Sequence, residues 1–135
     1  MTMQAAESSI IGSHVLTVLA SIRAQQSLID ALDAALADES ATVDQWRVLS
    51  ALRAAGPAAM TMGELAAATG IPRPTLSRIV DTLEDAASVF RHTGLADRRR
   101  ITVHVSDPGA ERLARMDAIV QAWEAAVAAR PDADA

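Results

Sequence analysis

Arginines concentrated in one part of the chain are the residues best suited to bind a polyanion. Residues 73–100 hold six arginines and four acidic residues, a local net charge of +2 in a chain whose overall net charge is −5. The other residues hold six arginines and thirteen acidic residues and carry −7. Lysine is absent, and a guanidinium group can donate paired hydrogen bonds to a phosphate or a guanine, although a genome rich in G and C would also favour arginine. Residues 73–100 are therefore the first candidates for a nucleic-acid interface.

A short helix that begins near Pro72 would present some of these arginines on one face. Prolines are tolerated in a first helical turn, and at 100° per residue Leu76, Ile79, Val80 and Leu83 fall together on an apolar side. The N-terminal half of the opposite side is polar, as a helix that enters the major groove requires. The candidate DNA-binding residues of this helix are Arg73, Pro74, Thr75, Ser77 and Arg78.

A hairpin follows, with strands predicted at residues 89–93 and 100–105 and a loop between them. Alternating apolar and polar residues in the second strand indicate one buried face. The loop end carries the candidate DNA-binding residues Asp97, Arg98, Arg99 and Arg100. Arginine suits a narrow, electronegative minor groove, and we hypothesise that Asp97 pairs with one arginine and thereby aims another. Taken alone, the same residues could be a solvated charge run.

Two further helices must position this helix and hairpin. Thr42 with Gln45, and Thr61 with Glu64, have the spacing of capping boxes and predict helices that run to Ala55 and to Gly70. The predicted fold class is mainly α with a small β-hairpin wing, in one domain of residues 1–135. Its centre is a winged helix-turn-helix over residues 42–105.

Both ends of the chain predict helices with heptad seams, at residues 8–37 and 107–129. A long helix with so broad an apolar face cannot bury it inside a small domain, so we expect a homodimer; a plain amphipathic core helix is the alternative. Residues 1–8 and 130–135 are expected to be loose. The predicted dimer interface comprises Ile11, Val15, Val18, Ile22, Met116, Val120, Trp123 and Val127.

The runs GELAAATGIPRPTLSRIVDTLED and DRRRITVHVSDPGAERL resemble the helix-turn-helix and the wing of the MarR family, over residues 42–113. The resemblance implies a homodimer that binds a pseudo-palindromic operator on double-stranded DNA, as a repressor that responds to a small-molecule effector. Ala87-Ser88 stands where members usually have Gly-Leu, so the preceding helix is expected to run on or to end differently. The last helix also looks short for the family, which would weaken the dimer.

The resemblance also implies a pocket for an aromatic or phenolic acid, with His14, Trp46, Arg47 and Trp123 as candidate lining residues; simple packing of the two tryptophans is the alternative. No catalytic set, metal site or cofactor site is predicted, because the three histidines lack ligand spacing and cysteine is absent. No stretch is expected to span a membrane and no signal peptide is recognised, which favours a cytoplasmic protein. A winged helix that only contacts other proteins is the alternative function.

Overall fold

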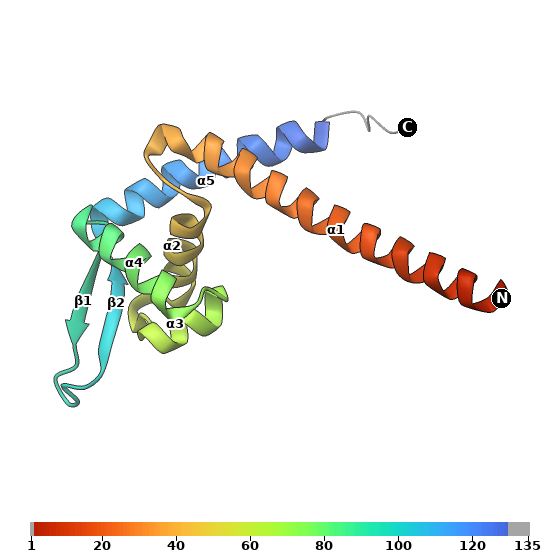
Figure 1. Ribbon diagram of the computed structural model, residues 1–135. Helices are drawn as coiled ribbons and strands as arrows, with labels where there is room; N and C mark the ends of the chain where they lie inside the picture. Colours follow the sequence, from red (N-terminus) through yellow and green to blue (C-terminus); the bar gives the residue numbers. More distant parts are fainter. Residues whose placement is uncertain (1, 130–135) are drawn as a thin grey trace.

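The computed structural model describes residues 2–129 and consists of helices with a two-stranded hairpin at one end (Figure 1). The helix α1 projects far from the other helices, and α5 crosses the C-terminal part of α1. The hairpin lies at the end of the molecule opposite to the free end of α1. In chain order the elements are α1 (Thr2–Leu36), the 3-10 turn η1 (Ala37–Glu39), α2 (Val43–Ala55), the 3-10 turn η2 (Gly56–Ala58), α3 (Met62–Thr69), α4 (Arg73–Asp85), β1 (Val89–Thr93), β2 (Ile101–Val105) and α5 (Asp107–Ala129).

The predicted helices and strands are present, with one difference at the N-terminal end. The helix α1 begins at Thr2, so the expectation of a loose start over residues 1–8 is wrong for the described part of that segment. Alanine and unbranched side chains favour helix, and nothing in this segment stops it from extending. The expected loose tail at residues 130–135 lies outside the described residues.

The two predicted capping boxes differ in the structure. Around Thr61 the box is complete, because its hydroxyl accepts from the Glu64 N–H and the Glu64 carboxylate accepts from the Thr61 N–H. At the start of α2 only half is formed: the Thr42 hydroxyl accepts from the Gln45 N–H at 3.2 Å. The Gln45 side chain turns instead to Arg112 of α5, whose Nη2 donates to its Oε1.

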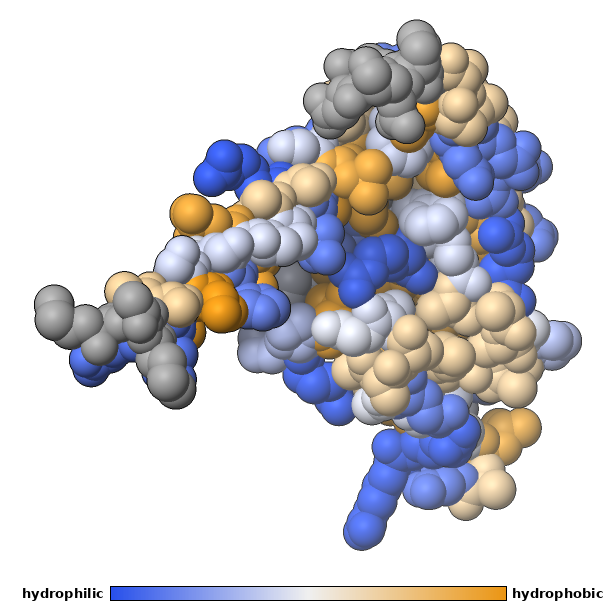
Figure 2. Space-filling view, turned by 90° about the vertical axis from the view of Figure 1, so that its right-hand side faces the viewer, coloured by the Kyte–Doolittle hydropathy of each residue, from blue (hydrophilic) through white to orange (hydrophobic). Residues whose placement is uncertain are grey.

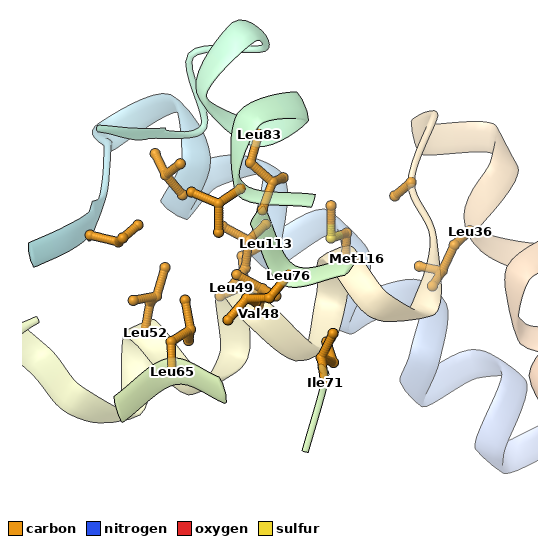
Figure 3. Close-up of a cluster of buried hydrophobic side chains, with 14 residues drawn as sticks. Leu36, Val48, Leu49, Leu52, Leu65, Ile71, Leu76, Leu83, Leu113 and Met116 are labelled. Carbon is orange, nitrogen blue, oxygen red and sulfur yellow. The ribbon is translucent and has the colours of Figure 1, made fainter. Parts of the chain in front are cut away.

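The core lies where α2, α3, α4 and the start of α5 meet under the sheet. Apolar side chains from each of these helices interdigitate there (Figure 3), as close packing of a small domain requires. Leu76, Val80 and Leu83 of α4 are completely buried, as predicted, and Ile79 is half-buried beside them. The apolar side of α4 is thus anchored, and its polar side faces outward.

The turn between α4 and β1 ends the helix as a glycine would, although no glycine is present. Ala87 adopts a left-handed backbone with φ 58°. The N–H of Ser88 donates to the Leu83 carbonyl at 2.8 Å and that of Ala87 to the Glu84 carbonyl at 2.9 Å, the two bonds of a Schellman motif. The expectation that α4 would run on or end differently is therefore wrong. Alanine accepts the strained conformation that glycine usually takes.

Buried Ser88 in turn holds the start of α5. Its carbonyl accepts from the Ser106 N–H, and a Cβ added to Gly109 would lie only 1.9 Å from that carbonyl oxygen. The Ser88 hydroxyl accepts from Arg112, which also donates to the carbonyls of Glu39 and Ser40. A single guanidinium thus joins α5 to η1, α2 and the end of α4.

The predicted seam of α1 is exposed over most of its length. Ile11, Val15, Val18 and Ile22 are each at least 50% exposed, whereas Leu36 at the other end is completely buried against the body. Figure 2 shows hydrophobic residues, mixed with more polar ones, on the projecting part of the molecule. The segment Gln4–Glu39 is also long and apolar enough to cross a membrane, by length and composition alone. The expectation that no stretch would reach that threshold is therefore wrong.

One predicted interface residue of α5 does not lie on the surface. Met116 is completely buried in the core of its own chain, so it has no surface to offer a partner, contrary to the prediction. The heptad spacing of α5 does not distinguish residues that pack on α2 of the same chain from residues further along α5 that remain exposed. Val120 and Trp123 are half-buried, and Val127 is 44% exposed.

Candidate nucleic-acid interface

The outward side of α4 carries the predicted recognition residues. Arg73, Pro74, Thr75 and Arg78 are exposed, and Ser77 is half-buried beside them. Helix α4 begins at Arg73 with no side-chain cap, so the N–H groups of Arg73 and Thr75 have no side-chain partner, while Pro74 between them has no N–H. Such a terminus attracts phosphate, and the side chains around it can reach both a phosphate and base edges.

The wing loop is held by its backbone. Asp97 Oδ1 accepts from the Arg99 N–H at 2.9 Å, and the Asp97 carbonyl accepts from the Arg100 N–H at 3.1 Å. Asp97 therefore makes no pair with a guanidinium within residues 2–129, and the hypothesis of an Asp–Arg pair is wrong. An Asx turn is the local alternative that short carboxylates commonly adopt. It still fixes the loop from which Arg98 and Arg99 project.

Gly94 closes the base of the same loop. Its N–H donates to the Arg100 carbonyl at 3.0 Å, and a Cβ added to it would lie 2.9 Å from the Asp97 carbonyl oxygen. Any larger residue would push the loop apart. The hydrogen-bonded turn itself lies at residues 97–100, so Gly94 serves the base of the loop and does not supply the turn, contrary to the prediction.

A cleft of 370 Å³ lies between the start of α3, the start of α4 and the wing, and four guanidinium groups line it. It is bordered by Thr61, Met62, Gly63, Arg73, Arg91, Arg99, Arg100 and Ile101. Arg73 reaches over α3, since a Cβ added to Gly63 would lie 3.6 Å from its Nη1. The fold thus brings together arginines that are up to 27 positions apart in the sequence. Their charges make the cleft suited to phosphate groups.

Two of the four cleft arginines are tied to acidic residues of the helices. Arg91 of β1 donates to both Asp81 and Glu84 of α4, at 2.9 Å each. Arg100 donates to Glu64 of α3 at 3.1 Å. These pairs brace the wing against the two helices of the helix-turn-helix. They also offset the acidic residues in the second half of α4, which would otherwise repel a duplex.

Glu64 combines capping and bracing. Hydrogen bonds from the hydroxyl and the N–H of Thr61, with a smaller contribution from Arg100, hold the pKa of the Glu64 carboxyl below its usual value. The carboxylate is therefore ionised at any pH near neutrality, and the bracing pair persists there.

Four arginines of the region are not engaged in this way. Within residues 2–129 no ion pair involves Arg73, Arg78, Arg98 or Arg99. In Figure 2 hydrophilic side chains gather at the lower end of the molecule, where the wing lies in Figure 1. The helix start and the wing loop therefore each carry arginines that have no acidic partner.

The predicted effector residues do not meet in one place. Trp46 Nε1 donates to Asp117 of α5 at 3.0 Å, and Arg47 is bound to Asp44 and to the Thr69 carbonyl. Trp123 lines a groove of 330 Å³ between α1 and α5, and His14 lies exposed on the projecting part of α1. The single chain therefore forms no pocket from these four residues among those the structure describes.

The bracing residues Arg91, Glu64 and Arg112 were not among the predicted site residues. Arg91 could have been found from its position. It lies two residues after Val89 in β1, and residues two apart in a strand point to the same face. That face packs against α4, where Asp81 and Glu84 lie one turn apart. Arg112 carried no such signal, because its partners come from segments distant in the sequence.

The exposed polar helix start, the arginine-bearing hairpin and the helices that brace them define a winged helix-turn-helix protein. The sequence profile of the MarR family matches residues 41–100. A MarR family transcriptional regulator from Silicibacter pomeroyi is 30% identical, with a TM-score of 0.69, over 88% of this chain and 78% of that one. This chain therefore belongs to the MarR family.

Two other relatives extend the comparison. The Mycobacterium tuberculosis regulator MOSR, solved in complex with DNA, is 27% identical with a TM-score of 0.71, over 85% of this chain and 82% of that one. A candidate transcriptional regulatory protein for the hcr operon of Thauera aromatica is 31% identical over 71 residues, which is 53% of this chain. The chain spans 43% of the length of that curated relative.

Proposed function

We propose that this protein is a homodimeric transcriptional repressor that binds a pseudo-palindromic operator in double-stranded DNA. The observation that carries the proposal is the set of arginines without acidic partners on the start of α4 and on the wing loop. One helix start would enter the major groove, and the wing would follow the backbone into the neighbouring minor groove. The DNA complex of the related MOSR supports this use of the fold.

The exposed seam of α1 supports the dimer. A row of apolar residues at least half exposed along several turns is what a soluble monomer rarely leaves uncovered. The α1 and α5 helices of a second copy would cover this apolar row. Burial in a dimer would also explain why α1 is as apolar as a membrane-spanning helix. We accordingly propose a cytoplasmic protein with the predicted interface residues other than Met116.

The recognition helix is tested with DNA selected from a random pool by the wild-type protein. Replacement of Arg78 by alanine should weaken binding to the selected sequence by about 1–3 kcal/mol and change scrambled DNA binding little. Arg115→Ala is the control, because that arginine lies on α5 and is paired with Glu39. Equal losses on selected and scrambled DNA would refute base recognition by Arg78.

The wing is tested by the salt dependence of binding. Each phosphate contact contributes about 0.9 to the slope of log K against log salt concentration, so Arg99→Ala should lower the slope by about 1. An unchanged slope and affinity would show that the wing does not touch the duplex.

Repression follows from geometry in this proposal, because a dimer seated on a promoter excludes the polymerase. A small aromatic or phenolic acid is the proposed effector, and it would act by changing the separation of the two recognition helices. The alternative is a winged helix that contacts only proteins, which the acidic remainder of the chain would suit. Salt-sensitive binding to DNA from the promoter of its own gene separates the two functions.

A further inference from the structure

Arg112 of α5 is a half-buried cation that is bound by neutral groups. Its Nη1 donates to the Ser88 hydroxyl at 3.2 Å, and its Nη2 donates to the Ser40 carbonyl at 2.9 Å and to Gln45 Oε1 at 3.3 Å. No ion pair among the described residues involves Arg112. Because a guanidinium is planar and its five N–H groups point in fixed directions, it fixes the relative positions of the acceptors that it joins.

One set of these acceptors lies at the end of α1. The helix runs into the turn η1, which ends at Ser40 with a left-handed φ of 54°. The carbonyls of Glu39 and Ser40, both of which accept from Arg112 Nη2, follow the last helical turn, where carbonyls without helical partners favour a cation. Arg112 therefore holds the base of the projecting helix by charge-assisted hydrogen bonds.

The Ser88 hydroxyl lies between the candidate recognition helix and the wing. Ser88 is 2% exposed, its N–H closes α4 through the Leu83 carbonyl, and β1 begins at the next residue, Val89. A displacement of Ser88 would therefore move α4 and the wing together. Arg112 joins this junction directly to the end of α1.

Neighbouring polar contacts do not make the same connection. Arg115, further along α5, donates to the Glu39 carboxylate, and Asp33 of α1 accepts from the Val43 N–H at 2.7 Å. These contacts hold the end of α1 to α5 and to α2. Among the hydrogen bonds and ion pairs of the described residues, those of Arg112 alone reach both the end of α1 and the junction of α4 with the wing.

A small tilt at this junction becomes a large displacement at the DNA-reading end of α4. The helix spans Arg73–Asp85, and from the rise per residue its two ends are about 18 Å apart. A tilt of about 10° at the Ser88 end moves the other end by about 3 Å over that length. The rise of one base pair is ~3.4 Å, so such a tilt shifts the helix start by nearly one base pair.

We propose that Arg112 is a positioning residue, which fixes the tilt of α4 and the wing relative to α1 and thereby the half-site spacing that the protein accepts. Helix α1 carries part of the predicted dimer interface, so the tilt determines how far apart the two recognition helices lie. The consequence for DNA rests on the proposed function, whereas the tilt within one chain does not. The tilt and the spacing are therefore measured separately.

The tilt is measured without DNA, as the distance between spin labels on α1 and α4. The chain has no cysteine, so Ala20→Cys and Thr75→Cys, at two exposed positions, introduce the attachment sites. Doubly labelled chains are diluted into excess unlabelled chain, so that pulsed electron paramagnetic resonance reports distances within one chain. Arg112→Met keeps much of the side-chain bulk and removes its donors, and it should widen the distance distribution by about 3 Å.

Two further variants make the test specific. Ser88→Ala removes the hydroxyl at the junction and should widen the distribution as Arg112→Met does, with no further widening in the double variant. Arg115→Met is the matched control, because Arg115 lies on the same helix and binds Glu39 without reaching Ser88, and it should change nothing.

An unchanged width in Arg112→Met or in Ser88→Ala overturns the proposal, and so does equal widening in the control. Should Arg112→Met prove unfolded by circular dichroism, Ser88→Ala alone decides the outcome.

The spacing is measured as the affinity for the selected operator and for two versions whose half-sites are one base pair closer together or further apart. The wild type should bind the altered operators about tenfold more weakly, the cost of one mismatched base pair, and Arg112→Met and Ser88→Ala should reduce this factor to about three. Arg115→Met should keep the wild-type factor. A variant that is only less stable binds all three operators more weakly by the same factor, so the ratio does not change.

The two measurements separate this proposal from the proposed function. Wider distances together with a reduced spacing factor support the role of Arg112. Wider distances in a protein that binds no DNA mean that the proposed function fails and that Arg112 still positions α4. Wider distances with an unchanged spacing factor overturn the role in spacing, and unchanged distances in a protein that binds its operator overturn this inference alone.

Discussion

Replacement of Ala87 by glycine should stabilise the protein, because this alanine holds a backbone conformation that costs an L-residue free energy. Ala87 has φ 58° and supplies one of the two hydrogen bonds that close α4. The turn positions the start of β1 and, through Ser88, the start of α5. The variant therefore tests whether this turn is built as the structure has it.

The magnitude follows from two opposing effects. An L-residue in the left-handed region costs about 1–2 kcal/mol, which glycine avoids. Glycine loses more conformational entropy on folding, which costs about 0.5–1 kcal/mol. Ala87 is exposed, so the methyl group contributes little burial. The net expectation is a gain of about 0.5–1 kcal/mol in the free energy of unfolding.

Urea unfolding followed by circular dichroism measures the change, at one fixed protein concentration because a dimer's stability depends on it. Ala86→Gly is the control, since Ala86 itself has φ −83° and therefore gains nothing from glycine. This control should lose about 0.5–1 kcal/mol. If the two variants are destabilised equally, Ala87 does not adopt the left-handed conformation and the reasoning is refuted.

Three further predictions concern the contacts that hold the fold together. Gly109→Ala should destabilise the protein by about 1–3 kcal/mol, because its methyl group would clash with the Ser88 carbonyl. Gly12→Ala is the control and should be neutral or stabilising, because its methyl group would meet no atom within 4 Å. Urea unfolding compares the two variants, and equal effects would contradict the packing of Gly109 on Ser88. Burial raises the pKa of Asp117, but hydrogen bonds from Arg53 and Trp46 outweigh it and the net pKa lies below the usual value. The charge of Asp117 therefore stabilises the fold above the unfolded-state pKa, and this stabilisation is lost as the pH falls through the folded-state pKa. Asp117→Asn should thus cost about 1 kcal/mol of unfolding free energy at pH 7 and progressively less below pH ~4. A cost that does not shrink in acid would contradict this prediction. Arg91→Ala should lose about 0.5–1 kcal/mol at low salt and less at high salt, as urea titrations at both would show, because the pairs with Asp81 and Glu84 are partly exposed.

Local patterns predicted the elements because their causes are local. The apolar side of α4 and the capping box at Thr61 depend on residues within a few positions of one another. Contacts between residues far apart in the sequence leave no such local pattern. Gln45 has the spacing of a cap, yet Arg112 captures it from 67 positions away.

The site was predicted in part for the same reason. Sequence alone placed arginines on the helix start and wing loop, but not the acidic partners that hold Arg91 and Arg100. Asp97 was expected to pair with a guanidinium, whereas a backbone N–H two residues on competes successfully for its carboxylate. Met116 shares a heptad with exposed residues, and only the crossing of α5 over α2 decides that it is buried.

The footprint of the protein on its selected operator tests the central claim most directly. Two recognition helices held outward by a dimer should protect two segments on one face of the duplex, related by twofold symmetry and about 10 base pairs apart. Hydroxyl-radical cleavage at saturating protein measures this spacing. A single protected segment, or no protection at low salt, would contradict the account.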